Sequence, residues 1–387
     1  MIRGTDHILV SHAGTLPKPN YLREAVIAKA GGQSVDEEAL AKHIRDSVAD
    51  VVKKQVDIGI DTINDGEMSK ASFTAYIRER LGGIETRELK PGEGPPRQAI
   101  GGRDVQEFPE YFAVGTGRSG AATGQNPLFC VSPLTYTGQA AVKADIDIFN
   151  EALQGVNANE AFLPAITPGT IEHWLRNEHY PNDEAYLFAL ADVLHEEYKA
   201  ITDAGLVLQV DDPDLADGWQ IHYGMTVPEY QKFAELRIDA LNHALRDIPE
   251  EQVRFHMCWG SYHGPHKFDI PLSDLVDLIL KVKAQTYSIE ASNTRHEHEW
   301  TVWEKAKLPD GKMLMPGVIG HASDFIEHPE LVAQRLVRYA NLVGRENVIA
   351  GTDCGIGSRV GHGSICWAKF EAMVEGAAIA TKQLWGR

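Results

Sequence analysis

Short apolar runs that alternate with helix-like segments constrain the fold of this chain most strongly. Nine such runs can form β-strands: residues 7–13, 58–64, 129–136, 161–166, 206–211, 255–260, 287–292, 313–319 and 347–352. The segments between them are long enough for helices, which leaves little room for antiparallel hairpins and predicts a parallel sheet. The clearest helix covers residues 182–204, where apolar side chains recur at helical spacing and Gly205 stands at the C-terminal cap position.

The pattern favours closure of this sheet into an α/β fold of the (β/α)8 TIM barrel type. Residues with reactive side chains follow at least five of the nine runs, and the βα loops at the carboxyl ends of barrel strands build the active site in that fold. A doubly wound sheet would gather such residues at a single crevice instead. Because a (β/α)8 barrel has eight strands, one run must lie outside the ring, and we expect it to be the N-terminal one.

Residues 86–126 differ in kind from the rest of the chain. Pro91, Pro95, Pro96 and several glycines interrupt any long helix there, while residues 111–114 are a candidate short strand. We interpret the segment as an insertion over the barrel mouth, within a single domain that spans residues 1–387. A linker between two domains is disfavoured, because no second set of strand–helix repeats precedes the segment.

Composition disfavours some classes of partner and indicates the cellular compartment. The chain has 37 Lys and Arg against 55 Asp and Glu, a net charge of −18, which disfavours a nucleic-acid or anionic-membrane surface. Four cysteines are too few for a disulfide framework in 387 residues and fit a reducing compartment. No apolar run approaches the roughly 18 residues that span a bilayer, and the N-terminus has no signal-peptide pattern. We therefore expect a cytoplasmic protein.

Four side chains form a candidate metal site. His256 and Cys258 lie two residues apart on a predicted strand, so they point to the same side of it. Glu290 and Cys354 each end a later apolar run. If these runs are neighbouring parallel strands, their carboxyl ends bring one nitrogen, one oxygen and two sulfur donors together, a set that suits Zn²⁺. A structural zinc usually has closely spaced ligand pairs on loops, so three separate strand ends favour a catalytic one.

The order of these motifs resembles the catalytic domain of cobalamin-independent methionine synthases. In that family the zinc ligands lie in the segments that match His256-x-Cys258, Ile289-Glu290 and Asp353-Cys354-Gly355. The resemblance covers roughly the whole chain, through the further segments Gly14-Thr15-Leu16-Pro17, Asp65-Gly66-Glu67, Gln209-Val210-Asp211-Asp212-Pro213 and Gly317-Val318-Ile319. It implies a zinc-dependent barrel enzyme that methylates homocysteine. Smaller relatives on this pattern include epoxyalkane:coenzyme M transferase.

The resemblance also assigns roles to several substrate-site residues. Glu67 and Asp211 match the two acids that hold the amino group of homocysteine, and two converging carboxylates are good partners for an ammonium. Thr15 matches a serine near the amino-acid carboxylate. His12 resembles the corresponding histidine of the short, single-barrel relatives. Glu290 is the ligand that we expect an incoming thiol to displace.

Three further candidates match the family less closely. His321 stands one place earlier than the family's general-acid histidine. Trp174 resembles the tryptophan that stacks on the pterin of methyltetrahydrofolate, although a tryptophan that begins an amphipathic helix is more often a core residue. Arg295, with two nearby histidines, either binds an acidic group of the substrate or belongs to a solvated helix start.

The sequence therefore predicts a zinc-dependent thiol S-alkyltransferase, with methyl transfer from 5-methyltetrahydrofolate or a related donor to homocysteine as the first hypothesis. The chain lacks the N-terminal barrel of the long methionine synthases, which keeps another methyl donor open. The alternative reaction is opening of an epoxide by a thiol at the same zinc. Expected partners are a small-molecule thiol and an alkyl donor, and a homo-oligomer is open. A metal-binding protein without activity is disfavoured, because substrate-site acids accompany the ligands.

Overall fold

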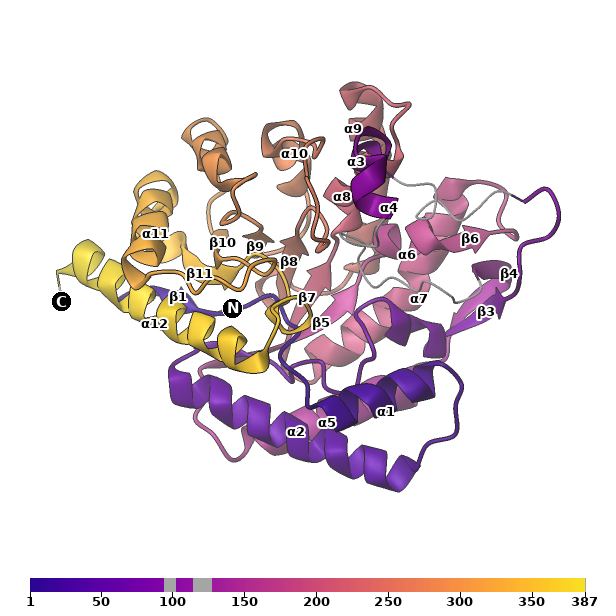
Figure 1. Cartoon of the computed structure of the whole chain (residues 1–387), viewed down its shortest axis with the longest axis horizontal. Coiled ribbons are helices and arrows are strands. Elements are labelled where there is room, and N and C mark those ends of the chain that lie inside the picture. The colour runs from indigo at the N-terminus through magenta and orange to yellow at the C-terminus, as the bar shows by residue number, and fades with distance from the viewer. Residues whose placement is uncertain (94–101, 114–126, 387) are drawn as a thin grey trace.

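A computed structural model describes residues 1–93, 102–113 and 127–386 of the chain (Figure 1). Its main element is an all-parallel sheet with the strand order β1-β11-β10-β9-β8-β7-β5-β2. The strands are β1 (Leu9–Val10), β2 (Thr62–Ile63), β5 (Glu160–Ile166), β7 (Val207–Asp211), β8 (Val253–Met257), β9 (Thr286–Ile289), β10 (Met313–Ile319) and β11 (Ile349–Thr352). The Asp61 amide donates to the Val10 carbonyl at 2.9 Å, so the two outer strands nearly close the barrel.

Helices pack around the outside of these strands (Figure 1). They are α1 (Asn20–Ala30), α2 (Glu37–Ile58), α5 (Gln139–Leu153), α6 (Pro168–Trp174), α7 (Asp183–Asp203), α8 (Asp214–Ile221), α9 (Val227–Ala244), α10 (Leu272–Ile279), α11 (Pro329–Val343) and α12 (Gly363–Trp385). Short 3-10 turns cover Ala75–Glu79, Glu250–Gln252, Glu297–Glu304, Arg345–Asn347 and Ile356–Ser358. One cluster of buried apolar side chains runs from Ile8 to Ala380 and joins the strands to the helices.

The helix predicted over residues 182–204 is confirmed as α7. Asn182 caps its first turn by accepting from the Ala185 amide at 2.8 Å, and Gly205 follows it with φ +80°. Its face toward the barrel is fully buried and includes Leu187, Leu190 and Leu194. The 3.6-residue period of apolar side chains was therefore a sound guide to which face packs.

The strand that lies outside the ring is not the N-terminal one, so that expectation was wrong. β1 pairs with β11 inside the barrel, whereas the run at residues 129–136 forms β4 (Leu128–Tyr136). β4 is antiparallel to β3 (Leu81–Thr86) and parallel to β6 (Leu175–Asn177) in a separate three-stranded sheet. Barrel strands are buried on both faces, but β4 exposes the Val131-Ser132-Pro133 stretch in its middle. The pairing register between β3 and β4 also shifts near this stretch.

Residues 102–113 of the predicted insertion form a segment that packs against α8 and the loop after β8. It forms α3 (Arg103–Glu107) and α4 (Pro109–Ala113), so the short strand expected at residues 111–113 is helical instead. Arg103 stacks on the Trp219 ring and donates to the Trp219 and His222 carbonyls, which fastens α3 to α8. Residues 94–101 and 114–126 of the predicted insertion lie outside the described residues.

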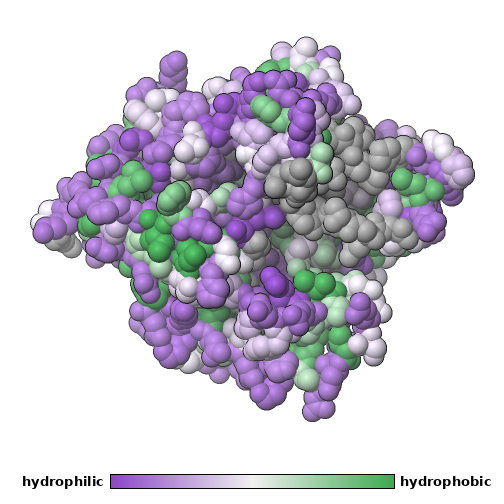
Figure 2. Space-filling model, viewed as in Figure 1, coloured by the Kyte–Doolittle hydropathy of each residue, from purple (hydrophilic) through white to green (hydrophobic). Residues whose placement is uncertain are grey.

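The surface agrees with the acidic composition. The face in Figure 2 is mostly hydrophilic, and apolar side chains occur on it in small separate patches. Within the described ranges, no helix combines the length and the apolar character needed to cross a bilayer.

Candidate active site

Three predicted metal ligands meet at the carboxyl end of the barrel. The ligand atoms of His256, Cys258 and Cys354 all lie within 4.8 Å of one another, and the two sulfur atoms are 3.6 Å apart. His256 belongs to β8, Cys258 follows it directly, and Cys354 lies two residues beyond the end of β11. Residues 96 positions apart are thus brought into contact by the closure of the barrel.

A buried polar layer supports this cluster from inside the barrel. The side chains of alternate residues on one strand share a face, so Arg254 precedes His256 on the inner face of β8. The fully buried Arg254 guanidinium donates to Gln209 Oε1, Ser11 Oγ and the His12 carbonyl, each at 2.8 Å. These bonds join β8 to β7 and β1, so the layer holds the strand ends that carry the site.

The two thiols do not share their protons equally. The Cys258 thiol donates to the Cys354 sulfur, which lowers the pKa of Cys354 well below its ordinary value and raises that of Cys258. Burial alone would lower the pKa of His256, but the adjacent Cys354 sulfur and Asp211 outweigh it and raise that pKa. The cluster therefore favours a negative charge on one sulfur beside an imidazole.

This donor set fits a tetrahedral metal ion. Two thiolates that each lie about 2.3 Å from a tetrahedral zinc are about 3.7 Å apart, and the observed separation is 3.6 Å. His256 Nδ1 bonds to Ser288 Oγ at 3.0 Å, whereas the buried Nε2 has no hydrogen-bond partner among the described residues. An oriented imidazole with one nitrogen held and the other free is typical of a metal ligand.

Glu290 lies beside this cluster in a different group. Its carboxylate accepts from the Trp259 amide at 2.8 Å and from Asn293 Nδ2. The second set of metal-capable side chains, again with ligand atoms within 4.8 Å, consists of Glu290, His321 and Asp353. Burial raises the pKa of Glu290. Three of the four predicted ligands thus form one cluster, and the fourth is held next to it by its own loop.

Both carboxylate oxygens of Asp353 accept hydrogen bonds from the chain itself. Its Oδ1 accepts from the Ala291 and Ser292 amides, both at 2.8 Å, and its Oδ2 accepts from Ser292 Oγ at 2.6 Å. The carboxylate ties the loop after Glu290 to the residue before Cys354. Asp353 therefore acts as a positioning residue for both.

His321 is buried and lies in this group with both ring nitrogens free of hydrogen-bond partners among the described residues. The structure places it beside Glu290 although its sequence position is one place early. An imidazole that is unpartnered and next to a metal-capable cluster is available to move a proton.

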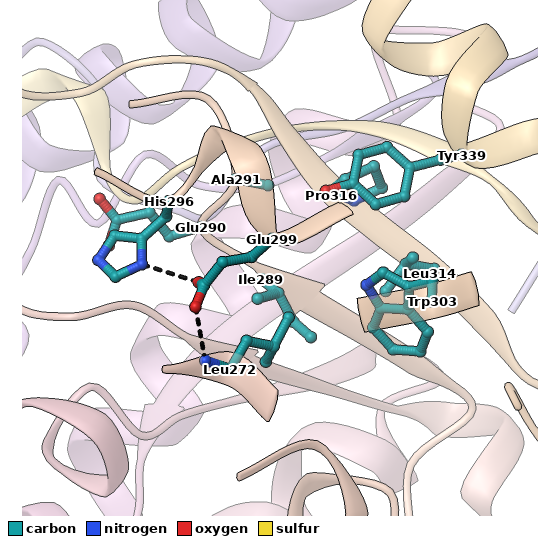
Figure 3. Close-up of a pocket in the computed structure, with 10 residues that line it drawn as sticks. All are labelled: Leu272, Ile289, Glu290, Ala291, His296, Glu299, Trp303, Leu314, Pro316 and Tyr339. Atoms are coloured by element: carbon teal, nitrogen blue, oxygen red, sulfur yellow. Dashed lines mark hydrogen bonds and ion pairs between the residues drawn. The ribbon is translucent and has the colours of Figure 1, made fainter. Parts of the chain in front are cut away.

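The loop that follows Glu290 leads to a second buried histidine (Figure 3). His296 stacks on Trp259 with ring centroids 3.9 Å apart, and it bonds to Glu299 at 2.8 Å and to Asp269 at 3.0 Å. Although burial opposes the charge, these acids raise the pKa of His296 to about 9. The cavity behind Glu290 has a volume of about 10 Å³, which is room for one water and not for a substrate.

The two predicted amine-binding acids, Glu67 and Asp211, belong to the same site. Glu67 Oε1 accepts from Thr15 Oγ1 at 2.8 Å, and Asp211 Oδ1 accepts from Gln209 Nε2 at 2.7 Å. Burial is the main cause that raises the pKa of Asp211 to about 7; His256 opposes this rise, and the charges of Glu67 and Cys354 add to it. These side chains therefore act on one another across the barrel mouth.

Glu67 also has an unusual backbone. Its φ is +57°, a conformation that residues other than glycine rarely adopt. A Cβ atom on the facing Gly14 would lie 2.7 Å from Glu67 Oε1, so only glycine lets the carboxylate reach Thr15. Strain of this kind is found at sites where a side chain must be aimed.

His12 is bonded within the chain, and of the two interpretations of Arg295 the structure favours the solvated helix start. His12 Nε2 bonds to Gln55 at 2.8 Å, and Nδ1 accepts from the Gly14 amide at 3.2 Å. Burial lowers its pKa to about 3, so it is a neutral residue that shapes the turn at Gly14. Arg295 is exposed and donates to the Lys267 carbonyl, because Asn293 caps the turn that carries it and directs it outward.

Trp174 lines a separate cavity of about 250 Å³ with Glu172, His173 and Arg176. No residue of the metal cluster lines that cavity, as far as the described residues show. The buried Trp174 Nε1 has no hydrogen-bond partner among those residues. Its position is therefore compatible with a ligand next to the ring and distinct from the thiol site.

Sequence reasoning missed Asp217. It lies on α8, six residues after Asp211, and no described residue donates a hydrogen bond to its carboxylate. Its nearest charged groups include Asp214, Asp269, His266 and Glu290. The signal that could have found it is the placement of an acid in the first turns of the helix after a strand that already ends in Asp211.

Comparison with known proteins agrees with this geometry. The chain is 25% identical to the methionine synthase of Sulfolobus acidocaldarius, over 96% of this chain and 91% of that protein. It is 26% identical to that of Sulfurisphaera tokodaii, over 96% and 92%. Among solved structures, a B12-independent methionine synthase from a Shewanella species in complex with selenomethionine has a TM-score of 0.74 at 21% identity, with 98% of this chain and 100% of that one covered.

A second structure, a putative vitamin-B12 independent methionine synthase from Listeria monocytogenes, has a TM-score of 0.66 at 16% identity, over 97% of this chain and 98% of that one. At this level of identity both structures support the barrel fold alone. The family model described as the catalytic domain of cobalamin-independent synthase matches residues 128–379. The chain therefore belongs to the cobalamin-independent synthase family, through its catalytic domain.

Proposed function

We propose that this protein is a zinc-dependent methyltransferase that methylates the thiol of homocysteine to give methionine, with 5-methyltetrahydrofolate or a related compound as the donor. The observation that carries the proposal is the cluster of the buried His256 and Cys258 with the half-buried Cys354. Its sulfur atoms are 3.6 Å apart, and one imidazole nitrogen has no partner among the described residues. Membership of the family supports the class of reaction. The match covers 96% of this chain and 91% or 92% of the two named relatives.

His256, Cys258 and Cys354 would hold the zinc, with Glu290 as the exchangeable fourth ligand. Bound there, zinc supplies Lewis acidity that keeps an incoming thiol deprotonated and nucleophilic near pH 7. Glu290 suits exchange because its loop already satisfies it: the Trp259 amide and Asn293 stabilise the carboxylate when it is away from the metal.

Glu67 and Asp211 would bind the amino group of the substrate. Each accepts a hydrogen bond from its neighbour, Thr15 or Gln209, on one carboxylate oxygen, and no described residue donates a hydrogen bond to the other oxygen. Two buried acids that repel each other gain most from a cation between them, and the ammonium of an amino-acid thiol provides one. A thiol that carries a sulfonate, such as coenzyme M, would be repelled instead.

His321 would deliver a proton to the leaving amine of the donor. Methyltetrahydrofolate is a poor electrophile until that nitrogen is protonated, and His321 lies next to the metal cluster with both ring nitrogens available. Trp174 would offer its ring to the flat donor, from the separate cavity that it lines.

The test is methyl transfer by the zinc-loaded protein, with methionine measured as the product. We expect transfer from methyltetrahydrofolate, lost in His321→Asn with zinc retained and weakened at the level of donor binding in Trp174→Ala. If methyltetrahydrofolate neither binds at millimolar concentration nor reacts while another methyl donor does, the folate part of the proposal is wrong. Turnover of an epoxide with a sulfonate thiol, and none with homocysteine, would overturn the proposal altogether.

A further inference from the structure

A fully buried lysine lies under the loop that follows β10. Lys369 belongs to α12, and its side chain has no solvent exposure. Its ammonium donates to both carboxylate oxygens of Glu327, at 2.7 and 3.0 Å, and to the Phe325 carbonyl. A buried ammonium without a partner would be strongly destabilising, so these bonds determine where the loop can lie.

Glu327 passes this restraint to the residue next to His321. Glu327 Oε1, which Lys369 also contacts, accepts from the Gly320 amide at 2.8 Å. The same loop is pinned at Asp324, which accepts from the Gly361 amide at 2.7 Å. Between these anchors the chain is exposed, with Phe325 85% exposed. Little apolar burial holds the loop, so the polar contacts must.

His321 depends on that anchoring more than the other residues of the site do. His256 is oriented by Ser288 and Asp211 by Gln209, but no described residue makes a hydrogen bond to the His321 ring. Its position relative to Glu290 and Asp353 is therefore set by its own backbone and packing. On one side that backbone is fixed by Gly320.

We infer that Lys369 is a positioning residue for His321, acting through Glu327 and the Gly320 amide. It touches neither the substrate nor the metal. Instead it holds the loop so that the imidazole stays beside Glu290. The kinetic part of this inference rests on the proposed role of His321 as the proton donor, whereas the anchoring part does not.

The test combines kinetics with hydrogen exchange on the full-length, zinc-loaded protein. In Lys369→Met we expect kcat to fall by about tenfold or more, with KM for homocysteine and zinc content within about twofold of wild type. The Gly320 amide should exchange faster. Glu327→Gln keeps one oxygen for Gly320 but replaces the second oxygen, which Lys369 contacts, by a donor. Its kcat and its Gly320 protection should therefore fall between those of wild type and Lys369→Met.

Two further variants separate positioning from general destabilisation. If Lys369→Met does not fold, Lys369→Met with Glu327→Leu removes both charges together, and the same losses are expected. Arg80→Met is the matched control: it breaks the buried contacts of Arg80 with Asp145 and Glu197, and should lower stability without changing kcat or Gly320 exchange.

Unchanged kcat and unchanged Gly320 protection in a folded Lys369 variant would overturn the inference. So would equal losses in Arg80→Met. If the wild-type protein transfers no methyl group, the proposed function fails, and Gly320 exchange in Lys369→Met then decides the anchoring alone.

Discussion

The two groups of metal-capable side chains at the barrel mouth differ in how far the protein already satisfies them. In the group of His256, Cys258 and Cys354, the thiols contact each other and one imidazole nitrogen is free. In the group of Glu290, His321 and Asp353, the two carboxylates together accept five hydrogen bonds from the chain. Residue type alone would make both groups metal sites, but in the second group the chain already supplies hydrogen bonds to both carboxylates, and only the His321 nitrogens lack a partner among the described residues. This difference favours the first group as the main holder of a metal, with Glu290 as an exchangeable ligand.

The largest expected effect concerns the first group. Cys258→Ser and Cys354→Ser should each weaken zinc binding by about 100-fold or more, because each removes a thiolate from the cluster. Equilibrium zinc titration against a competing chelator measures this. Glu290→Gln should cost less, since Glu290 is held outside the cluster of three.

Cys366→Ser and Cys130→Ser are the matched controls, because both cysteines are buried and free but lie outside the cluster. They should bind zinc as wild type does. Full zinc affinity in both Cys258→Ser and Cys354→Ser would show that these cysteines do not bind the metal.

The next largest effect concerns the two acids proposed to bind the substrate amino group, Glu67 and Asp211. Glu67→Gln and Asp211→Asn preserve shape and remove charge, and each should weaken homocysteine binding by about 1.5–3 kcal/mol, as expected for a charge-assisted hydrogen bond. Calorimetric titration of the zinc-loaded variants provides the measurement. Binding of a thiol that lacks the amino group should change much less, and equal losses for both thiols would rule out recognition of the ammonium.

The pH dependence of stability tests the hydrogen-bonded histidines next to Glu290. The shared acid Asp269 helps raise the pKa values of His266 and His296 to about 9, although burial opposes the charge on both rings. Both folded-state values are above the unfolded value of 6.5, so this stabilisation is full below pH 6.5 and lost as pH rises through 9. We expect a loss of about 2 kcal/mol over that window.

Denaturant unfolding at several pH values checks the size of this loss. Asp269→Asn should be less stable at pH 6.5 and should flatten the curve between pH 6.5 and 9, whereas substitution of the exposed His263 by Gln should leave it unchanged. A wild-type stability that does not fall across the window would contradict the charged state of these histidines.

The smallest expected effect is that of Arg295→Ala. Its side chain is exposed and bonds to a backbone carbonyl, so stability and homocysteine affinity should both stay within about 0.5 kcal/mol of wild type. A loss of substrate affinity above about 1 kcal/mol would return Arg295 to the binding site.

Local periodicity was a sound guide to most strands and to which side chains meet. Alternation along a strand placed His256 and Cys258 on one side, and the rule that parallel strands end at one edge brought Cys354 to them. The prediction about which run lies outside the barrel was wrong. Pro133 alone could not have corrected it, because the barrel strands β5 and β10 also contain a proline, Pro164 and Pro316. The exposed middle of β4 is what distinguishes it, and that became visible only in the structure.

Other features of the site could not have been predicted from the sequence. His12 looked available, but Gln55, 43 residues away, occupies its Nε2. Glu290 and Asp353 carry equally good ligand atoms, yet three donors on the adjacent loop, Ala291, Ser292 and the Ser292 hydroxyl, occupy Asp353. Nor does any local pattern connect Lys369 to the loop after β10.

The chain's own residue order was enough for the barrel, the family and the kinds of atom that meet at its mouth, because periodicity and strand direction act over short stretches. Which of those atoms remain free for a metal, a thiol or a proton was decided only when distant strands and loops came together. The physical reason is that a hydrogen bond needs its partner within about 3 Å. For Asp211, His321 and Glu290 that neighbourhood is assembled from segments far apart in the sequence.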